Sequence, residues 1–161
     1  EATKDGEFPD LPRFGVRMFL DKKLSDARYF GMGPQESYRD KHQAASHGLY
    51  RANVRDLHED YIRPQENGSH YDCNFVTVGN SKSGITVVSE QPFSFNASVY
   101  MQEELERANH NYELQESDST VFCIDYAQNG IGSNSCGPEV QEKYQLNEEQ
   151  FAFGVELILQ L

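Results

Sequence analysis

The sequence predicts an all-β protein built as an antiparallel β-sandwich. Two segments, one near the start of the chain and one at its end, alternate apolar and polar residues with a period of two. This period is typical of strands that bury one face. Between them, β-branched and aromatic residues are concentrated in short segments, and glycine, asparagine and proline mark the turns. At 161 residues, the chain is long enough for one domain with a core.

The alternating residues define the two outer strands. One face of the first segment carries the apolar residues Phe14, Val16, Met18 and Leu20. One face of the last segment carries Phe151, Phe153, Val155, Leu157, Leu159 and Leu161. Further strands are expected at 72–78, 84–89, 93–100 and 120–127. Turns are expected at 67–68, 79–80 and 82–84, where glycine and asparagine occur.

One short surface helix is expected over residues 102–110. Three glutamates lie in its early turns and His110 lies near its end, which suits the dipole of a helix. No other segment predicts a helix.

Charge and hydropathy exclude several kinds of partner. Acidic residues number 26 against 14 basic ones, which gives a net charge of -12. Such a chain repels the phosphates of nucleic acids and acidic membrane surfaces. No apolar run approaches the roughly 20 residues that cross a bilayer. We therefore expect neither a nucleic acid nor a membrane as a partner.

The cysteines indicate a reducing compartment. The chain has three cysteines, Cys73, Cys123 and Cys136, so they cannot all pair in disulfides within the chain. Their spacing is not typical of a metal site. We expect reduced thiols, a cytoplasmic protein and no metal ligands in this chain. Cys73 and Cys123 fall in expected strands and should behave as small apolar residues.

Four segments carry the most specific pattern. They are, in order, YFGMGPQESYRD at 29–40, YIRPQENG at 61–68, QPFSFNAS at 91–98 and GIGSNSCGP at 130–138. Together they resemble the C-terminal β-sandwich domain, known as domain five or the small chain, of the β-galactosidases of glycoside hydrolase family two. The resemblance runs from about Leu11 to the C-terminus.

The resemblance implies a large sandwich of the galactose mutarotase-like type, a supersandwich, of which residues 11–161 are a partial domain. Residues 1–10 are then a flexible lead-in. It also implies that the complete enzyme hydrolyses terminal β-D-galactosides such as lactose, with catalytic carboxylates in an upstream barrel domain. No catalytic residue is therefore expected here, and the fragment alone should be inactive.

The same resemblance implies partners and cofactors. The partners are the upstream barrel and sandwich domains, a galactoside substrate, and further copies of the enzyme in a homo-oligomer. Magnesium and sodium are implied for the complete enzyme, whereas no cofactor is expected in this fragment.

Two glutamates have a possible catalytic role. Glycoside hydrolysis usually needs two carboxyl groups, and Glu36 and Glu66 each lie in a loop shaped by proline or glycine. The alternative is structural, because a carboxylate beside a turn commonly accepts backbone N–H groups or pairs with an arginine such as Arg39 or Arg63. We favour the structural interpretation.

The segment 130–138 is the candidate substrate contact. In the resembling enzymes this loop reaches across to the mouth of the active site, and in some members a tryptophan near the position of Cys136 packs against the substrate. This chain has no tryptophan and a loop one residue shorter. Asn134, Ser135 and Cys136 are the residues expected to bind substrate. A tight turn that docks the domain to its neighbour is the alternative.

Two other functions remain open. One is an aldose mutarotase, which uses histidines with a carboxylate for proton transfer at a sugar ring. The candidate residues are His42, His47, His58, His70 and His110. The other is a stand-alone carbohydrate-binding module with exposed aromatic rings around Tyr61, Tyr71 or Tyr100, which would equally suit an interface.

Overall fold

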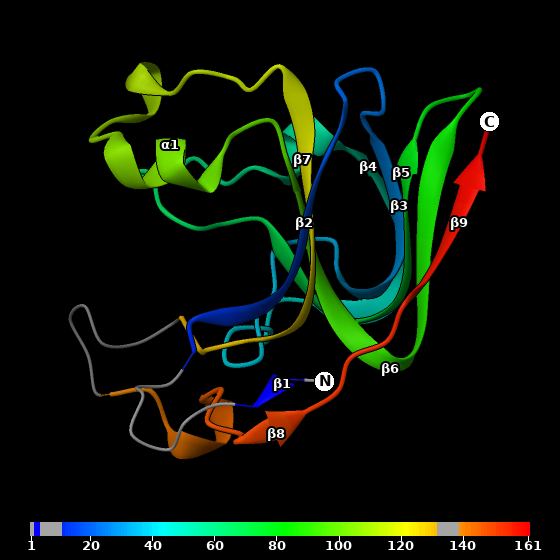
Figure 1. Ribbon diagram of the computed structural model, residues 1–161. Helices are drawn as coiled ribbons and strands as arrows, with labels where there is room; N and C mark the ends of the chain where they lie inside the picture. Colours follow the sequence, from blue (N-terminus) through cyan, green and yellow to red (C-terminus); the bar gives the residue numbers. More distant parts are fainter. Residues whose placement is uncertain (1, 4–10, 132–138) are drawn as a thin grey trace.

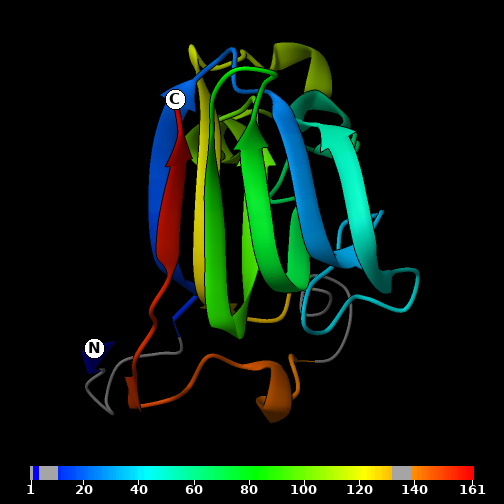
Figure 2. The ribbon, with the colours of Figure 1, turned by 90° about the vertical axis from the view of Figure 1, so that its right-hand side faces the viewer.

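A computed structural model describes residues 2–3, 11–131 and 139–161. The described residues form a structure made mostly of antiparallel β-strands, with one short α-helix (Figures 1 and 2). Its main sheet has seven strands in the order β2-β7-β6-β5-β3-β4, with β9 added beside β6. The predicted all-β, antiparallel fold class is confirmed.

The elements have the following bounds. The strands are β1 Ala2–Thr3, β2 Arg13–Asp21, β3 Asp26–Gly33, β4 Ser46–Asn53, β5 Ser69–Gly79, β6 Gly84–Ser98, β7 Ser119–Gln128, β8 Gln150–Phe151 and β9 Glu156–Gln160. The helix is α1 Gln102–Arg107, and the 3-10 turns are η1 Val54–Leu57, η2 Asn111–Glu113 and η3 Glu142–Tyr144. No helix among the described residues is both long and apolar enough to cross a membrane.

The sheet folds over because β6 bends along its length. The first part of β6 pairs with β9, and its last part, Ser94 to Ser98, pairs with β7. β5 follows β6 through both parts, and its register shifts on either side of Cys73. Such shifts are bulges, which bend a strand and increase its twist. Figure 1 shows β6 turning sharply, so that the two parts of one sheet face each other.

The core lies between these two parts. Most of its largest fully buried side chains come from β3, β5, β6 and β7, and they include Tyr29, Val76, Val78, Val87, Phe93, Phe95, Phe122 and Ile124. The rings of Tyr29 and Phe95 meet edge to face at 4.9 Å between centroids. Cys73 and Cys123 are both buried free thiols, as expected for small apolar residues.

Several element predictions need correction. The strands predicted at 84–89 and 93–100 are one continuous strand, β6, and the strands β3 and β4 were not predicted. The helix ends at Arg107 instead of His110. The carboxylate of Glu113 accepts the N–H groups of Asn109 and His110, at 2.8 and 3.2 Å, and so caps the separate turn η2.

The last alternating segment also differs from the prediction. It divides into β8 and β9 with irregular backbone between them, and Leu157 and Leu159 are 49% and 65% exposed. In β2, Met18 and Leu20 pack against the core, whereas Val16 is 55% exposed. A period of two identifies the faces of a strand, but whether a face is covered depends on what packs against it.

The predicted boundary at residue 10 stays a prediction. Residues 1 and 4–10 lie outside the described residues, and Ala2 and Thr3 pair with β8.

The conformation of the loop at 61–68 should require glycine at its last position, Gly68. Its φ is +71°, and an added Cβ would lie 2.5 Å from the carbonyl oxygen of Leu57. Gly68→Ala should therefore lower the free energy of unfolding by about 1–3 kcal/mol, measured by urea denaturation. Gly154→Ala is the control, because nothing lies within 4 Å of its added Cβ. Equal effects of the two substitutions would contradict the prediction.

Candidate functional site

The loops of the first two sequence motifs are joined by the carboxylate of Glu36. This side chain is 5% exposed, and it accepts hydrogen bonds from Lys41 Nζ and Tyr61 OH. Its other oxygen accepts the backbone N–H of Gly68 at 2.9 Å. Burial alone would raise the pKa of Glu36, but these three donors and the charge of Lys41 lower it below its ordinary value. Glu36 is thus an ionised link between two loops.

Glu66 belongs to a second, partly buried charge network. Arg13 donates from Nη1 to Glu66 at 3.3 Å and from Nε to Asp125 at 3.2 Å, and its Nη2 also contacts Asp125. Burial raises the pKa of both carboxyl groups, although the charge of Arg13 opposes this. Burial alone would lower the pKa of Arg13, but the hydrogen bond and the negative charge of Asp125 raise the pKa of this arginine above its ordinary value.

The arginines proposed from the sequence are not the partners of these glutamates. Arg63 is exposed, and Arg39 donates to the carbonyl oxygens of Lys143 and Gln145, each at 3.3 Å. Proximity in sequence suggested Arg39 and Arg63, whereas the partner of Glu66 is Arg13, brought in by the pairing of β2 with β7.

The four motifs meet in space. Glu36 of the first motif bonds to Gly68 of the second, and Asn96 in β6, within the third, donates to the carbonyl oxygen of Asn67. Asp40, at the end of the first motif, accepts the N–H of Ile131 at 3.2 Å. The beginning of the fourth motif is therefore attached to the first.

The predicted substrate contacts fall beyond this attachment. Residues 132–138, with Asn134, Ser135 and Cys136, lie outside the described residues. The described beginning of the segment is held by Asp40 and by the carbonyl oxygen of Tyr144, which accepts the N–H of Gly130 at 2.8 Å.

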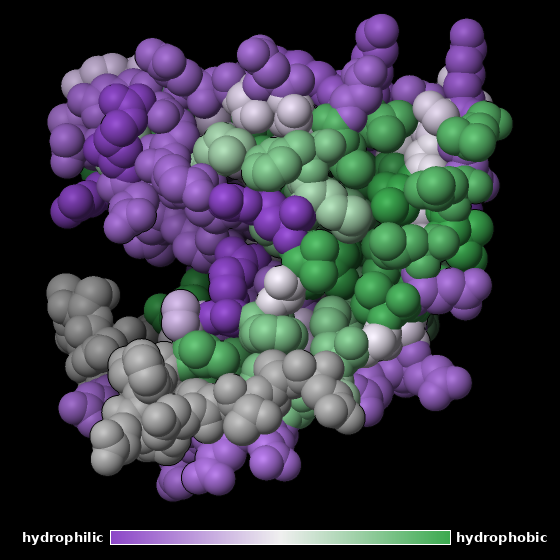
Figure 3. Space-filling model, viewed as in Figure 1, coloured by the Kyte–Doolittle hydropathy of each residue, from purple (hydrophilic) through white to green (hydrophobic). Residues whose placement is uncertain are grey.

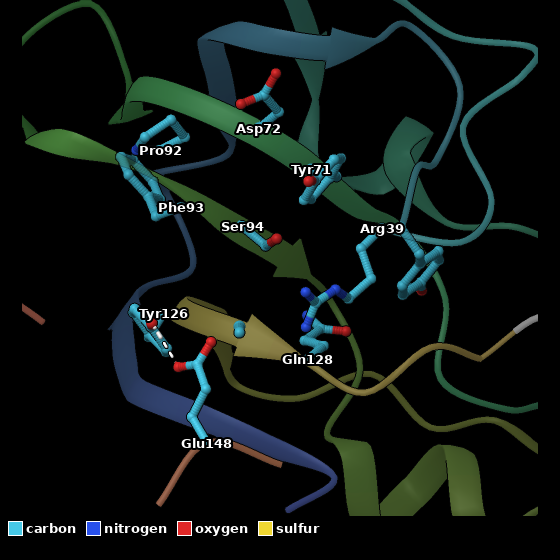
Figure 4. A pocket seen from close by; sticks show the side chains of 11 residues that line it. Arg39, Tyr71, Asp72, Pro92, Phe93, Ser94, Tyr126, Gln128 and Glu148 are labelled. Atoms are coloured by element: carbon cyan, nitrogen blue, oxygen red, sulfur yellow. Dashed lines mark hydrogen bonds between the residues drawn. The ribbon is translucent and has the colours of Figure 1, made fainter. Parts of the chain in front are cut away.

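A cleft of about 250 Å³ lies beside the charge network. Strands β5, β6 and β7 contribute to it, together with the first motif and Glu148, and it is lined by Tyr38, Arg39, Tyr71, Asp72, Pro92, Phe93, Ser94, Tyr126, Ala127, Gln128 and Glu148. In Figure 4 the guanidinium of Arg39 points toward Gln128 at one end, and Tyr126 and Glu148 lie at the other. Gln128 connects the cleft to the network, because it donates to Asp125 at 3.0 Å.

The histidines are dispersed. The ring of His70 stacks on Phe95 and packs against Tyr29, and burial lowers its pKa to about 4, so it is neutral at physiological pH. His110 pairs with Glu113, and His47 lies against Asp72. No group of three or more histidine, cysteine or acidic side chains among the described residues is arranged to hold a metal ion.

Sequence reasoning missed several residues of this region. Arg13, Asp125, Tyr126, Gln128 and Glu148 come from segments outside the four motifs. A signal for Asp125 was present, because this carboxylate ends an apolar run in a strand and needs a buried partner. No sequence pattern indicated that Tyr126 and Glu148 pair, since their contact depends on the path of the chain after β7.

Glu36 should contribute to stability in a pH-dependent way. Its pKa is lower in the folded state, so its contribution is complete above the unfolded pKa of about 4.3 and is lost as the pH falls through the folded value. The difference in urea midpoint between the parent and Glu36→Gln should stay constant from about pH 7 to pH 5 and shrink at lower pH.

Glu90→Gln provides the control for this measurement, because Glu90 is exposed and has no described side-chain partner. It should leave the midpoint almost unchanged at every pH. A difference between the parent and Glu36→Gln that widens in acid would contradict the assigned direction of the pKa shift.

Comparison with known proteins identifies the family. Residues 1–157 match the family described as the beta galactosidase small chain. The chain is 50% identical over 157 residues to a β-galactosidase of Actinobacillus pleuropneumoniae, covering 98% of this chain and 15% of that protein.

More distant relatives give the same result. A β-galactosidase of Staphylococcus xylosus is 42% identical and one of Kluyveromyces lactis is 31% identical, each over 98% of this chain. The chain spans 16% and 15% of the lengths of these two proteins. The chain therefore belongs to the β-galactosidase small-chain family.

Proposed function

We propose that this chain is the C-terminal sandwich part of a β-galactosidase that hydrolyses terminal β-D-galactosides such as lactose. Its role is to support the catalytic barrel, to line the rim of the active site through Asn134, Ser135 and Cys136, and to contribute to assembly. The observation that carries the proposal is the match along nearly the whole chain to proteins named β-galactosidase, of which it spans about 15%.

The carboxylates of the motifs support this division of labour. Glu36 is held by Lys41, Tyr61 and Gly68, and Glu66 shares Arg13 with Asp125. A general acid or nucleophile must reach the substrate with a suitable proton state. These carboxylates instead hold loops together, so we assign catalysis to a part of the enzyme outside this chain.

Exposed apolar strands support contacts with other domains. Several large apolar side chains of β2, of β9 and at the C-terminal residue are exposed, among them Val16, Phe19, Leu157, Ile158, Leu159 and Leu161. Figure 3 shows apolar residues gathered on the side of the molecule where Figure 1 draws β9. Large exposed patches of this kind mark interaction sites. We propose that the upstream barrel and sandwich domains, and further subunits of a homo-oligomer, contact this region.

We assign the cofactors to the remainder of the enzyme. Magnesium and sodium prefer oxygen ligands, and we propose that other domains of the complete enzyme supply them. The buried free thiols of Cys73 and Cys123 are consistent with a reducing compartment, and we propose a cytoplasmic location.

Hydrolysis of a chromogenic β-galactoside tests the proposed function. We expect activity in the complete protein and none in this chain alone, because the acid and the nucleophile lie elsewhere. The chromogenic substrate incubated with an unrelated sandwich domain alone measures nonenzymatic release. Activity of this chain alone, or an inactive complete protein, would refute the assignment.

The segment after Ile131 provides a test of substrate contact. In the complete enzyme, Asn134→Ala and Cys136→Ala should raise KM about 2- to 10-fold, the usual cost of one lost polar contact, and change kcat less. Ser81→Ala is the control, because Ser81 is exposed in the turn between β5 and β6. Unchanged values of KM in both variants would instead favour a turn that only docks the domain.

A further inference from the structure

The cleft beside the charge network has the composition of a site for a polar ring. Two partly exposed tyrosines, Tyr71 and Tyr126, contribute aromatic surface from different strands. The polar lining includes a guanidinium, a primary amide, a hydroxyl and a carboxylate, from Arg39, Gln128, Ser94 and Glu148. Ligand pockets commonly combine aromatic walls with a few such polar groups.

The balance of donors and acceptors selects the ligand class. Arg39 offers only donors and Glu148 only acceptors, while the amide hydrogens of Gln128 bond to Asp125 and Ser69 and leave its carbonyl oxygen as an acceptor. An anion would require donors alone and would face the carboxylates of Glu148 and Asp72, whereas a cation would face the guanidinium of Arg39. Sugar hydroxyls both donate and accept, so a neutral polyol matches the mixed lining. The volume of about 250 Å³ lies just below the roughly 300 Å³ at which sites for drug-sized ligands begin, which favours one ring.

The side chains at the two ends of the cleft are held in place. Tyr126 stacks on Phe151, with ring centroids 5.0 Å apart and planes 5° apart, and its hydroxyl donates to Glu148 at 2.7 Å. Gln128 donates to both Asp125 and Ser69. Fixing these groups before binding reduces the entropy lost when a ligand enters.

The rim contains a strained residue. Asp72 has φ of +56° within the bulge of β5, although it is not glycine, and its carbonyl oxygen bonds to His47 at 3.0 Å. Strained backbone of this kind is concentrated at ligand sites and in switch regions. The neighbouring Tyr71 is oriented by Ser37, whose hydroxyl accepts its N–H at 2.9 Å.

We propose that this cleft binds the ring of one neutral hexose, placed between Tyr71 and Tyr126, with its hydroxyls bonded to Glu148, Arg39 and Gln128. Figure 4 shows these groups around a common space. The choice of a hexose rests in part on the proposed function, because hydrolysis of lactose releases glucose and galactose. The binding of the ring is a separate property that hydrolysis does not measure.

The test is a titration of the complete enzyme with glucose and with galactose, in which saturation-transfer NMR detects the bound sugar. The enzyme is used both untreated and after reaction with a fluorinated galactoside, which traps the covalent intermediate of a retaining hydrolase. Tyr71→Ala and Glu148→Gln should each weaken hexose binding to the treated enzyme about 2- to 10-fold.

Matched controls lie outside the cleft. Tyr112→Ala removes a tyrosine that is 83% exposed, and Glu149→Gln changes the carboxylate adjacent to Glu148. Both should leave hexose binding unchanged, and thermal midpoints should confirm that all four variants are folded.

The experiment distinguishes failure of the proposed hexose site from failure of the proposed hydrolase function. Absence of hexose binding, or equal binding by the cleft variants and their controls, would overturn the cleft proposal even if the enzyme hydrolyses galactosides. Failure of the fluorinated galactoside to react would count against the proposed function. The cleft would then be judged from the untreated enzyme, where the same weakening in Tyr71→Ala and Glu148→Gln would support it and equal binding would overturn it.

Discussion

The bent pair of strands β5 and β6 is the constraint on which the rest of the structure depends. Both parts of the folded sheet use these two strands, so neither part can form its core without the other. The bend allows Phe95 and Ile124 on one side to share a core with Val78 and Val87 on the other. It also directs the third motif, in β6, toward the loops of the other motifs, and the fold and the candidate site thus have the same origin.

The pairing of the strands also determines which charged side chains meet inside the molecule. β2 and β7 pair so that Arg13 reaches Asp125, and the loop before β5 brings Glu66 to the same guanidinium. Two carboxylates that share one cation are partly uncompensated, and burial raises the pKa of each. Glu36 has the opposite shift because a lysine, a phenol and a backbone N–H all stabilise its ionised form. Similar residues in similar loops therefore differ through their partners.

The sequence revealed the fold class, most strands of the main sheet and the motifs, because alternation and turn residues are local properties. It did not reveal β3 and β4, where glycines and polar residues obscure the period of two, nor the bend that makes β6 one strand. The structural role of Glu36 could be anticipated from its loop, whereas Arg13 as the partner of Glu66 could not. Residues 13 and 66 meet only through the pairing of distant strands, and no local pattern contains that information.

The exposed strand β9 shows why a correct pattern can lead to a wrong expectation. Leucine alternates through the end of the chain as it would in a strand with a buried face, yet β9 is exposed along its whole length. The alternation is costly for a surface in water, since exposed apolar strands at a sheet edge promote aggregation. Packing by the remainder of a β-galactosidase, as proposed above, would account for both observations, because the pattern then reflects burial in the larger enzyme. On this account part of the stability of the sandwich comes from its partners, as expected when binding favours the folded state.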